Sequence, residues 1–64
     1  MPVATEFGEI PVKIGIFGGR VVSAKPEHDA CLAAARRAGV SLAAVADAAR
    51  VEAPRIGQTW EDGR

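Results

Sequence analysis

Residues 13–51 read KIGIFGGRVVSAKPEHDACLAAARRAGVSLAAVADAARV, and this stretch decides the fold of the chain. It contains an alternating strand that starts upstream at residue 9, a Gly-Gly turn, a second strand and two alanine-rich segments with helical spacing. The pattern predicts an α+β fold, with an antiparallel β-hairpin or three-stranded sheet packed on one face by two antiparallel helices. We expect one domain over residues 1–53 and a flexible polar tail over residues 54–64.

The register of the hairpin follows from which residues must share a face. We predict a three-residue loop, Phe17-Gly18-Gly19, because it places Ile14 opposite Val22 and gives Gly19 a left-handed conformation. The alternative two-residue loop would place Ile14 opposite Ser23. Upstream, residues 5–8 read as a tight turn and residues 1–4 as a short edge strand. The predicted apolar face of the sheet consists of Ile10, Val12, Ile14, Ile16, Val22 and Ala24.

Residues typical of helix ends indicate where the two helices begin and end. Pro26 suits the first turn of the first helix, and Gly39 suits its left-handed cap. Ser41 is expected to cap the second helix, which should end near Glu52 because Pro54 disfavours helical geometry in the residue before it. The helical residues predicted to face the sheet are Cys31, Leu32, Ala35, Leu42, Val45, Ala46 and Ala49.

Size and composition limit the classes of function. A chain of 64 residues buries about 60% of its unfolded surface, so we expect it to gain stability from copies of itself or from a larger subunit. Eight basic and eight acidic side chains cancel, which argues against nucleic-acid binding. There is no apolar run of membrane-spanning length and no export signal, and the one cysteine suits a reducing compartment. We therefore expect a soluble, cytoplasmic protein without a membrane partner.

Several motifs occur in an order that resembles one family. The chain carries Thr5-Glu6-Phe7-Gly8, then Lys13 on a strand, then Gly18-Gly19-Arg20-Val21-Val22. These are followed by Pro26-Glu27-His28-Asp29-Ala30-Cys31 and by Gly39-Val40-Ser41-Leu42. Over residues 3–53 this series resembles the C-terminal region of the LarC family of nickel-insertion proteins. Relative to the family pattern, His28 replaces a tyrosine and Ala30 replaces an acidic residue.

The resemblance implies a function in nickel-pincer cofactor synthesis. LarC-like proteins insert nickel into a pyridinium bis-thiocarboxylate mononucleotide in a CTP-dependent cyclometallase reaction, so nickel and CTP with a divalent cation become the expected ligands. The chain would be a module that does not catalyse the reaction alone and that works with a larger LarC-like subunit or with its own copies. An alternative from another class is a non-catalytic oligomerisation or interaction domain that retains the family scaffold.

Five residues are candidates for ligand contact. Lys13 and Arg20 could hold nucleotide phosphates, or they could belong to a solvated outer face. Glu27 and Asp29 could ligate a divalent cation, or they could complement the dipole of the first helix. His28 stands three residues before Cys31, so both could reach one metal ion, but a packed cysteine beside a surface histidine is the favoured interpretation. Trp60 could dock onto a partner or onto the domain itself.

Overall fold

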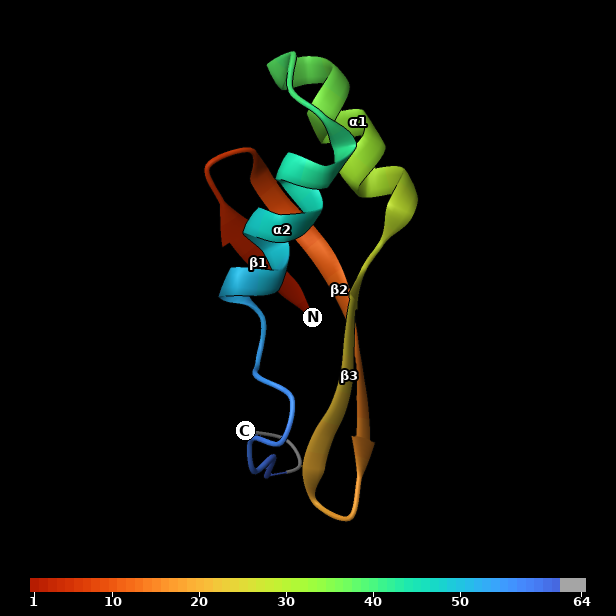
Figure 1. The fold of residues 1–64 in the computed structure, drawn as a ribbon, viewed down its shortest axis with the longest axis vertical. Coiled ribbons are helices and arrows are strands. Elements are labelled where there is room, and N and C mark those ends of the chain that lie inside the picture. Colours follow the sequence, from red (N-terminus) through yellow and green to blue (C-terminus); the bar gives the residue numbers. More distant parts are fainter. Residues whose placement is uncertain (62–64) are drawn as a thin grey trace.

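The computed structural model describes residues 1–61 and contains three strands followed by two helices (Figure 1). A single antiparallel sheet with strand order β1-β2-β3 is formed by β1 (Pro2–Thr5), β2 (Gly8–Phe17) and β3 (Arg20–Pro26). The helices are α1 (His28–Ala38) and α2 (Leu42–Glu52). The α+β prediction is confirmed. Within the described part of the chain, no helix is long and apolar enough to cross a membrane.

The first turn joins β1 to β2 as the sequence predicts. Thr5 pairs with Gly8, and the Thr5 hydroxyl both accepts from the Phe7 amide at 3.0 Å and donates to the Gly8 carbonyl at 2.7 Å. Gly8 has a φ of 103°, a backbone conformation that residues other than glycine rarely adopt. The edge strand expected near the N-terminus is therefore present as β1.

The register predicted for the β2–β3 hairpin is wrong. Phe17 pairs with Arg20, so the loop has two residues, and both Gly18 and Gly19 have the positive φ that a type I′ turn requires (59° and 73°). The ladder then passes from the Ile16–Val21 pair to the Gly15–Ser23 pair, which makes Val22 the extra residue of a β-bulge. Ile14 consequently lies opposite Ala24, which neither of the two loops considered from the sequence provides.

The bulge changes which valine is buried. Val21 is 1% exposed and Val22 is 53% exposed, the reverse of the predicted assignment. On β2 the prediction holds for Ile10 and Val12, which are buried, but Ile16 is 41% exposed. Alternation predicts the face of a residue, whereas burial also requires a covering element. The two helices cover the β1 end of the sheet and leave the far end of the hairpin beyond them (Figure 1).

The first helix begins later than predicted. Pro26 is the last residue of β3, Glu27 is the N-cap, and helical geometry starts at His28. The Glu27 amide donates to the Pro11 carbonyl at 2.9 Å, so this junction is still tied to β2. The C-terminal prediction is confirmed, because Gly39 is left-handed with φ 69° and ψ 32°.

The second helix reverses the chain and completes the core. The Ser41 hydroxyl caps it by accepting from the Ala44 amide at 3.1 Å, and the helix ends at Glu52 as expected. Predicted core positions Leu42 and Ala46 are partly buried against the core, and Ala34 joins it without having been predicted. The buried core consists of Val3, Ile10, Val12, Cys31, Ala34, Ala35, Val45, Ala49 and Ala53.

The segment after α2 returns to the hairpin. The Gly57 amide donates to the Val21 carbonyl at 2.7 Å, and the Val21 amide donates to the Gln58 carbonyl at 2.9 Å. The Trp60 amide donates to the Gly19 carbonyl at 2.8 Å, so Trp60, which is half-buried, lies on its own domain. These bonds give part of the expected tail a defined position along β3. Its flexibility stays a prediction, and residues 62–64 lie outside the described part.

Candidate functional site

Two of the predicted site residues meet at one depression. Lys13 on β2 lies directly opposite Lys25 on β3, on the face of the sheet away from the helices. Glu27 follows at the start of α1, where its backbone is bonded to Pro11. A shallow cavity of about 350 Å³ is lined by Pro11, Val12, Lys13, Lys25, Pro26 and Glu27.

The charges around this depression suit an anion together with a cation. Like charges that lie directly opposite each other destabilise a sheet, and Lys13 and Lys25 have that arrangement. An anion between the two ammonium groups would relieve this repulsion. A phosphate group would supply the anion, and the adjacent Glu27 carboxylate is the type of oxygen ligand that hard divalent cations prefer. Sequence reasoning missed Lys25. The signal that would have identified it is the correct register, which pairs Lys25 with Lys13.

Arg20 lies far from this depression. It pairs with Phe17, four ladder positions from the Lys13 pair, which corresponds to roughly 13 Å at ~3.3 Å per residue. Its guanidinium donates to the Gly57 carbonyl at 3.0 Å. The structure therefore gives Arg20 a contact that positions the C-terminal segment, and it does not bring Arg20 to Lys13.

The other two candidate residues do not line this depression. Asp29 is exposed in the first turn of α1, where its charge complements the helix dipole. His28 is exposed at the rim of a different cavity, between the helices. Among residues 1–61, no group of three or more His, Cys, Asp and Glu side chains is placed to hold a metal ion.

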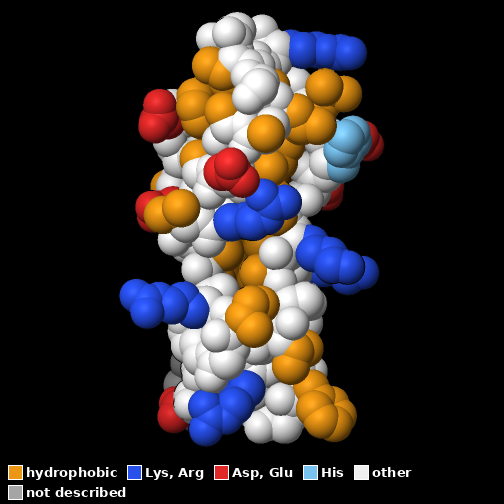
Figure 2. Space-filling view, in the orientation of Figure 1, with side chains coloured by type: hydrophobic (Ala, Val, Ile, Leu, Met, Phe, Trp, Pro, Cys, Tyr) orange, Lys and Arg blue, Asp and Glu red, His pale blue; other side chains and the backbone are white. Residues whose placement is uncertain are grey.

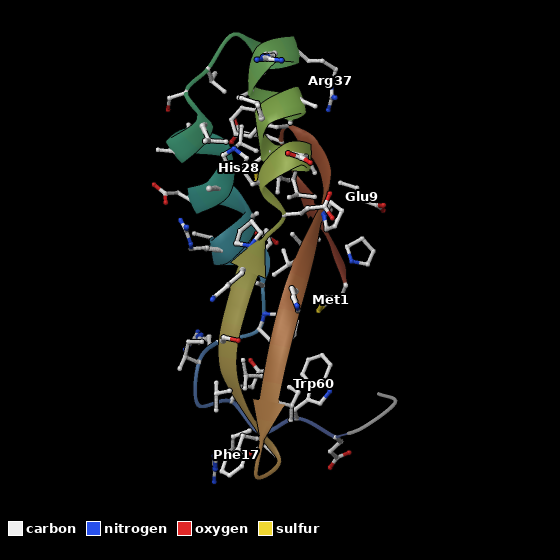
Figure 3. All side chains as sticks on the ribbon, turned by 90° about the vertical axis from the view of Figure 1, so that its right-hand side faces the viewer. Met1, Glu9, Phe17, His28, Arg37 and Trp60 are labelled. Atoms are coloured by element: carbon white, nitrogen blue, oxygen red, sulfur yellow. The ribbon has the colours of Figure 1, made fainter. Side chains whose placement is uncertain are left out.

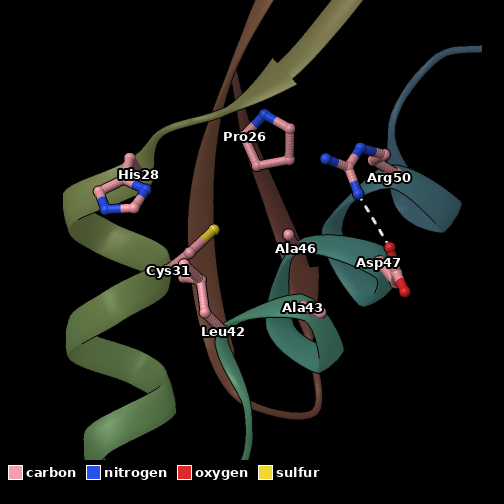
Figure 4. Close-up of a pocket in the computed structure, with 8 residues that line it drawn as sticks. All are labelled: Pro26, His28, Cys31, Leu42, Ala43, Ala46, Asp47 and Arg50. Atoms are coloured by element: carbon pink, nitrogen blue, oxygen red, sulfur yellow. Dashed lines mark hydrogen bonds and ion pairs between the residues drawn. The ribbon is translucent and has the colours of Figure 1, made fainter.

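The cavity between the helices has an apolar floor and a polar rim (Figure 4). Its volume is about 310 Å³. The Cys31 thiol points into it and is 2% exposed, while Arg50 lies on the opposite side and is paired with Asp47 at 2.8 Å. The interpretation of Cys31 as a packed cysteine beside a surface histidine fits this geometry. The cavity is lined by Pro26, His28, Cys31, Leu42, Ala43, Ala46, Asp47 and Arg50.

Burial of Cys31 leads to a prediction about alkaline stability. Burial raises the pKa of the thiol above its usual value of 9.0, Arg50 acts to lower this pKa, and Glu27 adds to the increase. Because the folded-state pKa is the higher one, the contribution to stability is complete below the unfolded pKa and is lost as the pH rises through the folded pKa. We expect urea unfolding to show a stability loss above about pH 9 that Cys31→Ala reduces. An identical alkaline loss in Cys31→Ala would contradict this assignment.

Comparison with known proteins identifies the family. The nickel insertion protein family matches residues 1–46, which include all three strands, α1 and the start of α2. The chain belongs to this family, so the resemblance to LarC proteins is confirmed. The match includes Lys13, Lys25 and Glu27.

Individual relatives carry corresponding names. The chain is 48% identical over 40 residues to the pyridinium-3,5-bisthiocarboxylic acid mononucleotide nickel insertion protein of Thermotoga sp. strain RQ2. It is 44% identical over 57 residues to a protein of Thermomicrobium roseum that is provisionally named a nickel insertion protein. These alignments cover 62% and 88% of the chain but only 10% and 14% of the relatives. No solved structure matches the chain at a significant level.

Proposed function

We propose that this chain is a module of a LarC-like nickel-insertion system that uses CTP with a divalent cation. The supporting observation is that the family match over residues 1–46 contains the Lys13–Lys25 pair and Glu27 around one depression. Nickel and a pyridinium-3,5-bisthiocarboxylic acid mononucleotide are the proposed substrates, by analogy with the named Thermotoga relative. We place the module in the cytoplasm, where it works with a larger LarC-like subunit or with its own copies.

In this proposal, the basic and acidic residues of the depression bind different parts of the nucleotide–cation complex. Lys13 and Lys25 hold nucleotide phosphates as two ammonium donors on one sheet face. Glu27 contributes a carboxylate to the divalent cation that accompanies the phosphates. The strands supply a rigid base for this arrangement, because the Glu27 amide is bonded to the Pro11 carbonyl on β2. Nickel passes through the complete system as substrate, and this module contributes nucleotide contact.

Nucleotide titration followed by backbone NMR tests this proposal. With CTP and Mg²⁺, we expect saturable amide shifts at Lys13, Lys25 and Glu27, and Mn²⁺ should broaden the Glu27 signals. Lys13→Ala should weaken binding about tenfold to a hundredfold, since a hydrogen bond to a charged group is worth ~1.5–3 kcal/mol. Arg36→Ala is the control, because Arg36 is an exposed cation in the last turn of α1.

Two results would overturn the proposal. One is the absence of any saturable shift with CTP and Mg²⁺. The other is equal weakening by Lys13→Ala and Arg36→Ala, which would indicate non-specific attraction between the nucleotide and basic side chains. Failure to bind, combined with self-association, would favour the non-catalytic interaction domain.

A further inference from the structure

One edge of β2 is open over half of its length. β1 pairs with β2 from Gly8 to Pro11, and Met1 extends this contact to Val12 through two hydrogen bonds of 2.7 Å. β3 covers the opposite edge of β2 as far as Phe17. From Lys13 to Phe17, the β1-side edge of β2 therefore has no paired strand among residues 1–61.

The hydrogen-bond pattern shows which backbone groups face this open edge. The amide and carbonyl of Val12 both bond to Met1. Because every second residue of a strand points its backbone groups to the same edge, the amides and carbonyls of Ile14 and Ile16 face the open edge too. The contacts of Val21 agree, since its amide and carbonyl bond to the C-terminal segment and not to Ile16 opposite it. Because the bulge lies in β3, β2 itself remains regular and can accept another strand.

Apolar side chains gather at the same end of the molecule. Phe17 is 79% exposed, Ile16 is 41% exposed, and hydrophobic groups are visible around the end of the hairpin (Figure 2). Figure 3 shows Phe17 at the tip, far from the helices. An exposed strand edge with apolar side chains is a template for pairing with another strand.

We propose that the open edge of β2 pairs antiparallel with the same edge of a second copy of this chain. The open segment is bounded by the Met1–Val12 contact at one end and by the turn at Gly18 at the other, so its midpoint is Gly15. A two-fold axis at Gly15 uses all five residues of each copy. Other registers either overlap β1 or pair fewer residues.

This register is complementary in backbone, shape and charge. Ile14 of one copy faces Ile16 of the other, which forms two hydrogen-bonded pairs and covers apolar surface on the helix side of the sheet. Gly15 faces Gly15, where the two backbones approach most closely. On the opposite face, Lys13 lies opposite Phe17 of the second copy, so the like charges avoid each other and the ammonium group meets an aromatic ring. The dimer joins two three-stranded sheets into one.

Sedimentation velocity over a concentration series, together with amide hydrogen exchange, tests the pairing. We expect a concentration-dependent dimer with protection of the Ile14 and Ile16 amides that increases with protein concentration. Ile16→Pro removes an amide that the β2–β3 ladder does not use, and it should weaken dimerisation at least about tenfold. Phe17→Lys places a lysine opposite Lys13 of the second copy and should weaken dimerisation without affecting the fold, because Phe17 is exposed.

Val51→Lys is the matched control, since Val51 is also 79% exposed but lies on α2. It should dimerise like the unaltered chain. A monomer at all concentrations overturns the pairing, as does a dimer that Phe17→Lys leaves intact. Uptake of a strand only from an added full-length nickel insertion protein would also overturn pairing between copies. The test does not involve nucleotide, so its outcome is separate from that of the proposed nucleotide contact.

Discussion

Ile10→Ala is expected to remove a large part of the stability of the fold. Ile10 is 1% exposed and contacts the core formed by β1, α1 and α2. Removing a buried isoleucine side chain costs ~2–5 kcal/mol. A folded chain has roughly 0.05–0.15 kcal/mol of stability per residue, or about 3–10 kcal/mol at this length. Circular dichroism during urea unfolding should therefore show a much lower midpoint than in the unaltered chain, or no cooperative transition.

Ile16→Ala is the matched control for this experiment. Ile16 has the same side chain, lies on the same strand and has the same strand parity, but it is 41% exposed. We expect a change within about 0.5 kcal/mol in the free energy of unfolding, as for other exposed positions. Equal costs at Ile10 and Ile16 would contradict the position of the helices over the β1 end of the sheet.

The second large effect is expected at Val21. Val21→Ala should destabilise the chain by about 1.5–3 kcal/mol, the value of burying a side chain of this size. Val22→Ala should cost no more than about 0.5 kcal/mol, because Val22 is the exposed bulge residue. Urea unfolding of the two variants measures both values. A larger loss of stability for Val22→Ala than for Val21→Ala would instead support the bulge-free register predicted from the sequence.

Truncation after Ala53 tests whether the C-terminal segment covers the Val21 side chain. The truncated chain lacks the segment whose Gly57 amide and Gln58 carbonyl bond to Val21. If that segment provides the cover, Val21→Ala should cost much less in the truncated chain than in the full chain, and the two changes should not be additive. Additive costs would show that Val21 is buried independently of the C-terminal segment.

Features of the fold that depend on local chemistry could be predicted from the sequence. Gly39 and Ser41 fix the boundary between the helices through a left-handed cap and a hydroxyl cap, and both were predicted correctly. The turn at Thr5 depends on contacts within four residues and was also predicted. Each feature is determined by neighbouring residues, so a single sequence contains the required information.

The prediction failed where distant residues decide the structure. A bulge at Val22 allows Val21 and Ala24 to share a face although they are three positions apart, and strict alternation cannot represent this. The backbone of Val21 also bonds to the segment around Gly57, which has no periodic pattern that would indicate pairing with a strand. The predicted register depended on burying Val22, so the error in burial produced the error in pairing.

The same error affected the candidate site. Lys13 and Glu27 were selected from their charge and from the family resemblance, and the structure places both at one depression. Lys25 was missed because the wrong loop paired Ala24 with Val12 and left Lys25 outside the argument. Arg20 was selected by its position near the turn, but its side chain contacts the Gly57 carbonyl.

The contact between Arg20 and Gly57 spans 37 positions of the chain and has a consequence for protein synthesis. Residues 57–60 are synthesised after both helices, so the hairpin strands can pair before the groups that bond to Val21 and Gly19 exist. Until those residues have been synthesised and have left the ribosome, the end of the hairpin cannot reach its final arrangement.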